Sequence, residues 1–221
     1  MIELYHVWKQ YQKPHWALSD INLSVEKGAF LFITGPSGSG KTTLLKTIFR
    51  EVIPTEGQII IDGKNILRIP DHKIYTLRRS MGIVFQDFRL LFHRRVFDNV
   101  AVALRVQGAP VRDMKRKVFL ALRMVNLHRR IWDYPTHLSY GEQQRLAIAR
   151  AVVNSPRILL ADEPTGNLDP ELAQEIIALF SEINRQGTTV IICSHDREMI
   201  RRFGGQVLYL HEGILHTKET S

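Results

Sequence analysis

The sequence predicts an α/β fold in which an antiparallel β subdomain precedes a parallel sheet and an α-helical subdomain is inserted into the chain. Three observations support this prediction. The first quarter of the chain is rich in strand patterns, whereas the stretch 88–137 has none. The last third alternates strands and helices, which is typical of a parallel sheet joined by crossover helices. With 221 residues, the chain is long enough to bury one sizeable core.

The early elements follow from residue type and spacing. Residues 2–8 and 21–25 combine β-branched and aromatic residues around a turn-rich gap, which predicts two strands. The apolar run 30–33 predicts a short buried strand, and apolar residues at helical spacing predict a helix over 42–50. A further strand is expected at 58–61.

The remaining elements are predicted by the same patterns. The expected strands are 81–85, 158–161, 188–193 and 206–210, and the expected helices are roughly 97–107, 113–127, 140–153, 170–185 and 196–203. Cys193 ends one of the strand patterns, so we expect it to be a buried strand residue.

The segment GPSGSGKTT has the pattern of a phosphate-binding loop, G-x-x-x-x-G-K-[ST]. A loop between a strand and a helix points several N–H groups at one spot, and the helix N-terminus adds partial positive charge there. Lys41 is expected to reach the β- and γ-phosphates, and Thr42 to hold Mg²⁺. A turn that binds nothing is the alternative, which the complete pattern disfavours. The expected nucleotide-binding residues are Gly35, Pro36, Ser37, Gly38, Ser39, Gly40, Lys41, Thr42 and Thr43.

Two carboxylates, Asp162 and Glu163, follow the apolar run 158–161. Open α/β sheets bind ligands at the carboxyl ends of their strands. We therefore expect Asp162 to support Mg²⁺ and Glu163 to orient an attacking water or take its proton. A solvated strand end is the alternative for this pair alone, and the phosphate loop favours function.

The segment LSYGEQQR at 138–145 predicts a second helix start. Ser139 and Glu142 have the spacing of a capping box. One reading is a well-capped helix and no more. The functional reading is that this helix N-terminus, with Ser139 and Gly141, offers donors to another phosphate. Since the phosphate loop already occupies one side of an ATP, this reading implies an ATP shared between two copies of the chain.

Together, GPSGSGKTT, LSYGEQQR, ILLADEP, GNLD and SHD resemble the ATP-binding-cassette (ABC) ATPases over essentially the whole chain. The resemblance implies one nucleotide-binding domain over 1–221, with a helical subdomain at about 88–150. It implies an enzyme that hydrolyses ATP, requires Mg²⁺ and forms a homodimer on ATP binding. In such a dimer, the phosphate loop of one subunit and the signature of the other enclose each nucleotide. The signature residues here are Ser139, Tyr140, Gly141 and Glu142.

The resemblance also implies roles for residues outside these patterns. Tyr11 resembles the aromatic residue that stacks on adenine, with Trp8 and Trp16 as nearby alternatives. Gln86 resembles the glutamine that senses Mg²⁺ and the attacking water, and His195 the histidine that contacts the γ-phosphate. The loop expected to cross the dimer interface is Gly166, Asn167, Leu168 and Asp169. The implied catalytic residues are Glu163, His195 and Gln86, and the implied metal ligands are Thr42, Gln86 and Asp162.

This sequence departs from the family pattern at Tyr140, where glycine is usual, while the following Gly141 is retained. Finer resemblances at 85–91 and 96–101 indicate the cell-division branch of the family, whose members work with an integral membrane protein to gate cell-wall hydrolysis. The segment 92–94 departs from that branch. DEPTGNLD is shared with lipoprotein-release and macrolide-export ATPases, so a transport ATPase stays open. Nucleic-acid ATPases of the superfamily usually have two cassettes or a long coiled coil, which this sequence does not show.

The chain is basic, with a formal net charge of +8 and a sequence pI of about 9.8. The stretch 105–130 holds eight Lys and Arg residues against Asp113, and three readings compete for it: a solvated face, a surface near anionic lipid, or a nucleic-acid contact. No apolar run approaches the length of a membrane span, and the N-terminus does not resemble a secretory signal. These observations predict a cytosolic chain, and the resemblance to the cell-division branch implies a peripheral location at the cytoplasmic face of the inner membrane.

Overall fold

The computed structural model of the chain describes residues 1–12 and 14–217 and contains two sheets. The first is four-stranded and antiparallel, in the order β2-β1-β4-β5. The second is six-stranded, in the order β10-β9-β3-β8-β7-β6, and is parallel except for the pair β9–β10. The strands are β1 (Ile2–Gln10), β2 (Trp16–Val25), β3 (Phe30–Thr34), β4 (Glu56–Ile61), β5 (Lys64–Asn65), β6 (Met81–Val84), β7 (Ile158–Asp162), β8 (Thr189–Cys193), β9 (Gln206–His211) and β10 (Ile214–His216).

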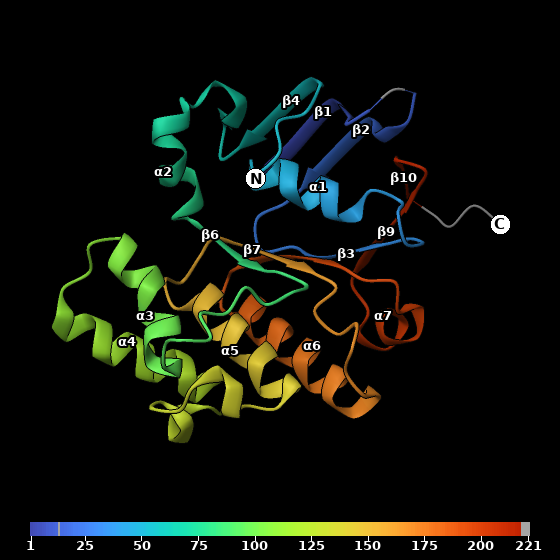
Figure 1. Cartoon of the computed structure of the whole chain (residues 1–221). Coiled ribbons are helices and arrows are strands. Elements are labelled where there is room, and N and C mark those ends of the chain that lie inside the picture. Colours follow the sequence, from blue (N-terminus) through green and yellow to red (C-terminus); the bar gives the residue numbers. More distant parts are fainter. Residues whose placement is uncertain (13, 218–221) are drawn as a thin grey trace.

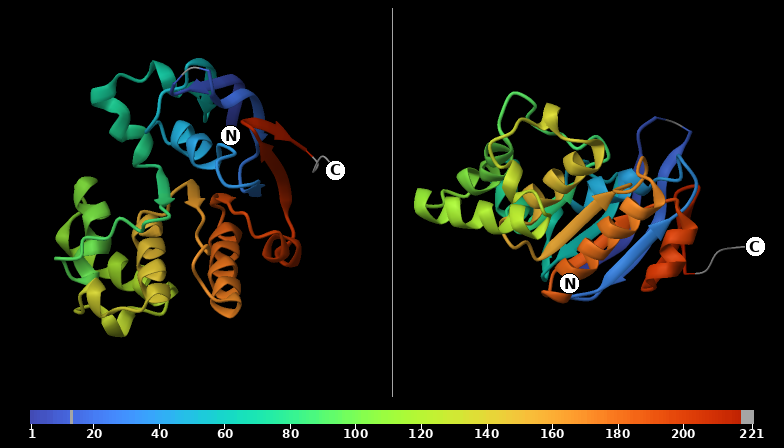
Figure 2. Two further views of the ribbon diagram at one scale, coloured as in Figure 1. Left: turned by 45° about the vertical axis from the view of Figure 1, so that its right-hand side comes forward. Right: turned by 90° about the horizontal axis from the view of Figure 1, so that it is seen from below.

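Helices cover both faces of the six-stranded sheet (Figure 1). The α-helices are α1 (Lys41–Ile48), α2 (Ile74–Arg78), α3 (Val96–Val106), α4 (Val111–Met124), α5 (Tyr140–Val152), α6 (Pro170–Arg185) and α7 (Arg197–Phe203). Short 3₁₀ turns lie at η1 (Ile66–Arg68), η2 (Asp71–Lys73), η3 (His128–Arg130) and η4 (Pro135–His137). Helix α1 lies between the two sheets, whereas α5 and α6 lie next to each other on the opposite face of the six-stranded sheet (Figure 2).

The alternation of side chains along the strands builds two cores. In β3, Leu31 and Ile33 pack with α1 and the antiparallel sheet, while Phe32 packs with the helices on the other face. Strand β8 divides in the same way, and Cys193 is buried on the α1 side as expected. Because both faces are covered, these strands are continuous apolar runs rather than alternating polar and apolar ones.

The structure confirms the predicted fold class and adds elements that the patterns did not predict. Strand β2 begins at Trp16, and α2, β5 and β10 are additional. Strand β10 pairs with β9 through a two-residue turn, Glu212–Gly213, in which both residues have positive φ (47° and 77°). This is the geometry of a tight type I′ hairpin. Helices α3, α4 and α5 group at one end of the molecule (Figure 1). The exact bounds of the helical subdomain, 88–150, stay a prediction.

Within the described residues, no helix combines the length and apolar character that a membrane span requires.

Candidate active site

The phosphate loop connects β3 to α1 and depends on two glycines for its path. A Cβ on Gly35 would lie 2.0 Å from the carbonyl oxygen of Leu210, and a Cβ on Gly40 would lie 2.3 Å from that of Ala17. Gly40 also has φ of 107° and caps α1, so a side chain there would be strained as well as crowded. The loop can therefore follow this path only with glycine at both positions.

Lys41, the first residue of α1, is buried with 6% of its surface exposed. Its Nζ donates hydrogen bonds to the carbonyl oxygens of Gly35 at 2.8 Å and Pro36 at 3.1 Å. The same Nζ lies 3.5 Å from Glu163 Oε1. The ammonium group is thus held at the mouth of the loop, beside the carboxylate at the end of β7.

Glu163 links this lysine to His195. Strands β7 and β8 are parallel neighbours with Asp162 opposite Cys193, so the segments that follow the two strands leave the sheet at the same edge. Glu163 Oε2 lies 2.9 Å from His195 Nδ1 and accepts a hydrogen bond from the backbone N–H of His195 at 3.3 Å. Glu163 has φ of 46°, which turns its side chain out of the strand path and toward the loop. The carboxylate is therefore fixed from two sides.

Asp162 is buried, and among the described residues its Oδ1 has no hydrogen-bond partner. Burial raises the pKa of this carboxyl, and its hydrogen bond with Thr42 opposes that shift. A buried oxygen without a partner is costly unless a cation or donor meets it. The described residues contain no cluster of three or more His, Cys, Asp or Glu side chains suited to a metal. A cation here would therefore use one carboxylate with hydroxyl, amide and phosphate oxygens, which is how Mg²⁺ binds with nucleotides.

Most of the predicted residues meet around one cavity of about 530 Å³. Its lining is Ala17, Pro36, Ser37, Gly38, Gly40, Lys41, Thr42, Thr43, Gln86, Glu163, Gly166, Asn167 and His195. A second hollow of about 480 Å³ shares Thr42, Gln86 and Asn167 with the first. Its remaining lining is Lys46, Phe85, Asp87, Arg89, Tyr140 and Asp162. The sequence patterns do not predict Ala17 and Lys46 as lining residues, because neither belongs to a motif.

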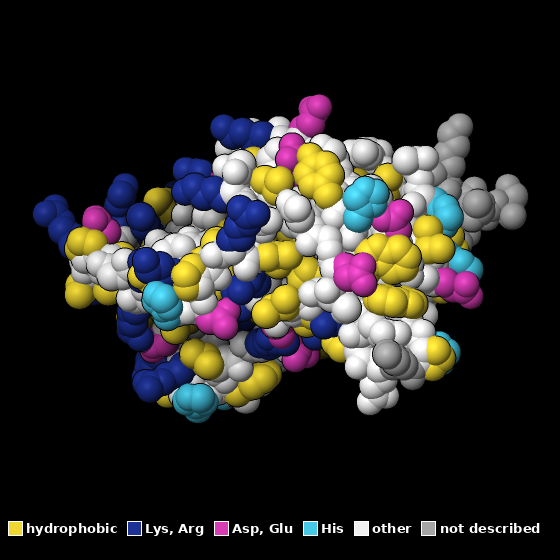
Figure 3. All heavy atoms as spheres, turned by 90° about the horizontal axis from the view of Figure 1, so that it is seen from above, with side chains coloured by type: hydrophobic (Ala, Val, Ile, Leu, Met, Phe, Trp, Pro, Cys, Tyr) yellow, Lys and Arg dark blue, Asp and Glu magenta, His cyan; other side chains and the backbone are white. Residues whose placement is uncertain are grey.

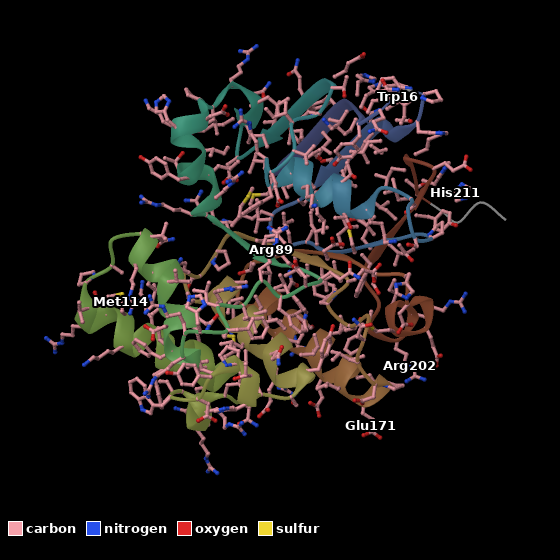
Figure 4. The ribbon with its side chains drawn as sticks, viewed as in Figure 1. Trp16, Arg89, Met114, Glu171, Arg202 and His211 are labelled. Carbon is pink, nitrogen blue, oxygen red and sulfur yellow. The ribbon has the colours of Figure 1, made fainter. Side chains whose placement is uncertain are left out.

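Tyr11 does not line either cavity. Its ring is 58% exposed in the connection between β1 and β2, and Lys9 Nζ lies 5.1 Å from the ring centroid. Trp8 and Trp16 contact each other, with their rings 5.2 Å apart at an angle of 72°. Trp16 projects at the far end of the antiparallel sheet, whereas Arg89 lies in the middle of the molecule (Figure 4). Trp16 directly precedes the cavity residue Ala17, so Tyr11, Trp8 and Trp16 all stay open as candidates for stacking on adenine.

The signature segment starts α5 as a capped helix, which confirms the predicted capping box. Ser139 Oγ accepts a hydrogen bond from the backbone N–H of Glu142 at 3.3 Å, and Glu142 Oε2 accepts one from the N–H of Ser139 at 2.8 Å. Neither side chain lines the phosphate cavity of its own chain. Asp169 caps α6 by accepting from the N–H of Leu172 at 3.0 Å, and Leu168 packs against the core.

The fold and the cavity define an ATPase with a P-loop core. The family model of the ABC transporter matches residues 18–166, which is more than half of the chain, and the chain belongs to this family. It is an ABC-type ATPase that hydrolyses ATP to ADP and phosphate.

Several relatives are similar over nearly their full length. The chain is 45% identical to the cell division ATP-binding protein FtsE of Escherichia coli K12, covering 98% of this chain and 97% of that protein. Identity to FtsE of Bacillus subtilis is 42%, covering 100% and 96%. The dimeric structure of MJ0796, a bacterial ABC transporter cassette, superposes with a TM-score of 0.88 at 36% identity, covering 96% of this chain and 95% of that one. A post-hydrolysis dimer of MJ0796 bound to ADP and Pi has the same TM-score at 35% identity, covering 96% and 95%.

Proposed function

We propose that this ATPase is the nucleotide-hydrolysing subunit of a bacterial cell-division complex at the cytoplasmic face of the inner membrane. Its partner would be an integral membrane protein of the FtsX type, which the resemblance to FtsE implies. ATP-driven dimerisation would gate peptidoglycan hydrolysis on the far side of the membrane. The ATP-hydrolysing role in this proposal rests on one observation. The phosphate loop, Gln86, Glu163 and His195 line the same cavity.

Within this site, the groups have separate tasks. The loop N–H groups and Lys41 hold the phosphates, and Glu163 takes a proton from water or orients it for attack on the γ-phosphate. His195 keeps the Glu163 carboxylate in place through its 2.9 Å contact and would itself contact the γ-phosphate. Thr42, Gln86 and Asp162 would hold Mg²⁺, which supplies charge neutralisation at the β- and γ-phosphates when bound.

The site is incomplete in one chain under this proposal. Ser139 and Gly141 lie at a helix start and do not line the phosphate cavity of their own chain, so they would act on the ATP of a second copy. The similarity to the dimeric MJ0796 cassette supports this arrangement. A ligand that binds the closed pair better than the separate subunits drives closure by linkage.

A groove beside the loop 85–89 suits the membrane partner. It has a volume of about 450 Å³ and lies between α2, β6, α3 and α5. Phe85 and Arg89 line this groove while Gln86, between them in the chain, lines the ATP cavity. A partner segment seated here would therefore touch the loop that senses the nucleotide.

The chemistry of the groove defines the segment that fits. Its lining combines apolar side chains such as Ile74, Met81 and Val102 with four arginines and no carboxylate. Those arginines are Arg78, Arg79, Arg89 and Arg150. We infer that the docking segment is an amphipathic helix with an apolar face and acidic residues at its edges.

The outer face of α4 supports a location at an anionic membrane surface. Arg112, Lys115, Arg116, Lys117 and Arg123 are exposed, and none of them forms an ion pair with a described residue. Phe119 and Leu120, on the same exposed side, are 44% and 50% accessible. In Figure 3, Lys and Arg gather at the end of the molecule that carries the helical subdomain. Each such cation near an anionic bilayer contributes about 1 kcal/mol, and exposed apolar side chains can insert between head groups.

The experiment that tests the partner is a capture from bacterial membranes with the Glu163→Gln chain and ATP, followed by mass spectrometry. The expected result is an FtsX-type protein, captured with ATP and lost when Arg79 and Arg89 are both changed to Glu. Recovery of a lipoprotein or small-molecule transporter instead would overturn the division role and leave the ATPase assignment in place.

A further inference from the structure

Tyr140 connects the start of α5 to two loops of its own chain. Its hydroxyl accepts a hydrogen bond from Asn167 Nδ2 at 2.8 Å. Its ring centroid lies 4.7 Å from that of Phe88, at an interplanar angle of 57°. The capping box of Ser139 fixes the backbone directly before it. A glycine at this position can make neither contact, because both use side-chain atoms.

The loop after Gln86 is bound to α5 at a second point. Arg150, near the other end of α5, donates hydrogen bonds to the carbonyl oxygen of Arg89 at 2.6 Å and to that of Phe88. Phe88 and Arg89 have φ of 56° and 48°, so these carbonyls leave the usual strand or helix direction and turn toward the guanidinium group. Both ends of helix α5 thus hold this loop, the first through Tyr140 and the last through Arg150.

The first turns of α5 and α6 are also fixed against each other. A Cβ on Gly141 would lie 2.2 Å from Leu172 Cδ2, so the Leu172 side chain of α6 packs directly against this glycine. One turn further, Arg145 forms an ion pair with Glu175. The hydrogen bond between Tyr140 and Asn167 extends this line of contacts from the helices into the loop that follows Glu163.

Asn167 lines both cavities, and Tyr140 lines the second one beside Asp162 and Gln86. The same tyrosine is the neighbour of Ser139, which under the proposed function meets the ATP of the partner subunit. If the partner's ATP displaces the start of α5, Tyr140 would move with it. Its single side chain would then transmit the movement to the residues around the chain's own ATP.

We propose that Tyr140 is a positioning residue that couples the two ATP sites of the dimer. This inference rests on the proposed dimer with shared ATP. Two sites are coupled when occupancy of one changes the contacts made at the other. Here the contact is the pair Tyr140–Asn167, with the Phe88 ring as the second branch toward Gln86.

The test measures the Hill coefficient of Mg-ATP binding. The full chain carries Glu163→Gln as the parent, so that hydrolysis does not deplete the ligand. Dimer formation is followed by light scattering in the same samples. The parent is expected to bind with a Hill coefficient of about 1.5–2, because the two sites bind cooperatively. Tyr140→Phe keeps the ring and removes the hydroxyl contact, and Asn167→Ala removes the other partner. Each is expected to lower the coefficient below that of the parent, and the double variant to do no more than either single one.

Tyr5→Phe is the matched control. Tyr5 has an exposed ring and a hydroxyl that donates to Glu3 at 3.2 Å, and it lines neither cavity. It is expected to keep the parent coefficient. The proposal is overturned if Tyr140→Phe keeps the Hill coefficient of the parent, or if the effects of the two single variants add in the double variant. It is also overturned if the parent dimerises but binds Mg-ATP with a Hill coefficient of 1. A parent that stays monomeric at saturating Mg-ATP overturns the shared-ATP dimer itself, and the coupling with it.

Discussion

Glu163 Oε2 lies 2.9 Å from Nδ1 of His195, while Oε1 of the same carboxylate lies 3.5 Å from Lys41 Nζ. One side chain therefore joins the end of β7, the end of β8 and the start of α1. This junction is where we expect the proton of the attacking water to be received.

Replacement of Glu163 by Gln keeps the size and hydrogen-bonding reach of the side chain but removes its basicity. ATP binding is expected to remain, and turnover to fall by roughly 10²–10⁴-fold. Steady-state phosphate release and an ATP titration on the same protein measure the two effects. Turnover at the level of the unmodified protein would exclude Glu163 as the base.

Replacement of Lys41 by Ala removes the buried ammonium group at the mouth of the loop. Because this group is proposed to balance the phosphate charge, nucleotide binding is expected to be lost. A titration with labelled ATP measures it, with Lys64→Ala as the comparison, since Lys64 is exposed and lines neither cavity. Unchanged affinity in the Lys41 variant would refute the assignment.

Replacement of Gly40 by Ala is expected to destabilise the fold as well as the site. The new Cβ would meet the backbone oxygen of Ala17 at 2.3 Å. Gly28→Ala is the control, since Gly28 also has positive φ, 77°, but no atom within 4 Å of the new Cβ. Both variants carry the backbone strain of roughly 1–2 kcal/mol, so the extra loss of melting temperature in the Gly40 variant measures the clash. Equal melting temperatures would show that the loop relaxes freely.

Replacement of Asp162 by Asn removes a buried charge that has an unpaired oxygen. Without Mg²⁺, the variant is expected to melt at a higher temperature than the parent, because an uncompensated buried carboxylate is unfavourable. The further stabilisation that Mg²⁺ gives in the presence of ATP should disappear. Thermal melts with and without Mg²⁺ measure both effects, and Asp113→Asn on exposed α4 should change neither. A lower melting temperature without Mg²⁺ would contradict the burial argument.

Reversal of three charges on α4, as Arg112→Glu, Arg116→Glu and Arg123→Glu together, should abolish binding to vesicles that contain phosphatidylglycerol. ATPase activity is expected to stay, since none of these side chains lines the site. The control reverses three exposed arginines elsewhere, Arg185, Arg201 and Arg202, and so changes the net charge equally. Equal loss in both variants would indicate net charge alone, and binding to DNA rather than vesicles would favour the nucleic-acid reading.

Local motifs and apolar periodicity predicted different parts of the molecule. The phosphate loop, the acidic strand end and the capped α5 start carry their chemistry in local spacing, so the sequence alone located them. Helix α2 and strand β10 are too short for a periodic signal, and β10 depends on a turn of Glu212 and Gly213. The sequence marks Tyr140 as a signature residue that departs from the family pattern, but not its contacts with Asn167 and Phe88, because these join residues distant in the chain.

The loop 85–89 presents Phe85 and Arg89 to the groove and Gln86 to the ATP cavity. A segment in the groove and a nucleotide in the cavity would therefore contact the same short loop. The proposed membrane partner would therefore respond to ATP hydrolysis through this loop directly, and substitutions among the other groove residues would adapt the ATPase to a different partner without altering the nucleotide cavity.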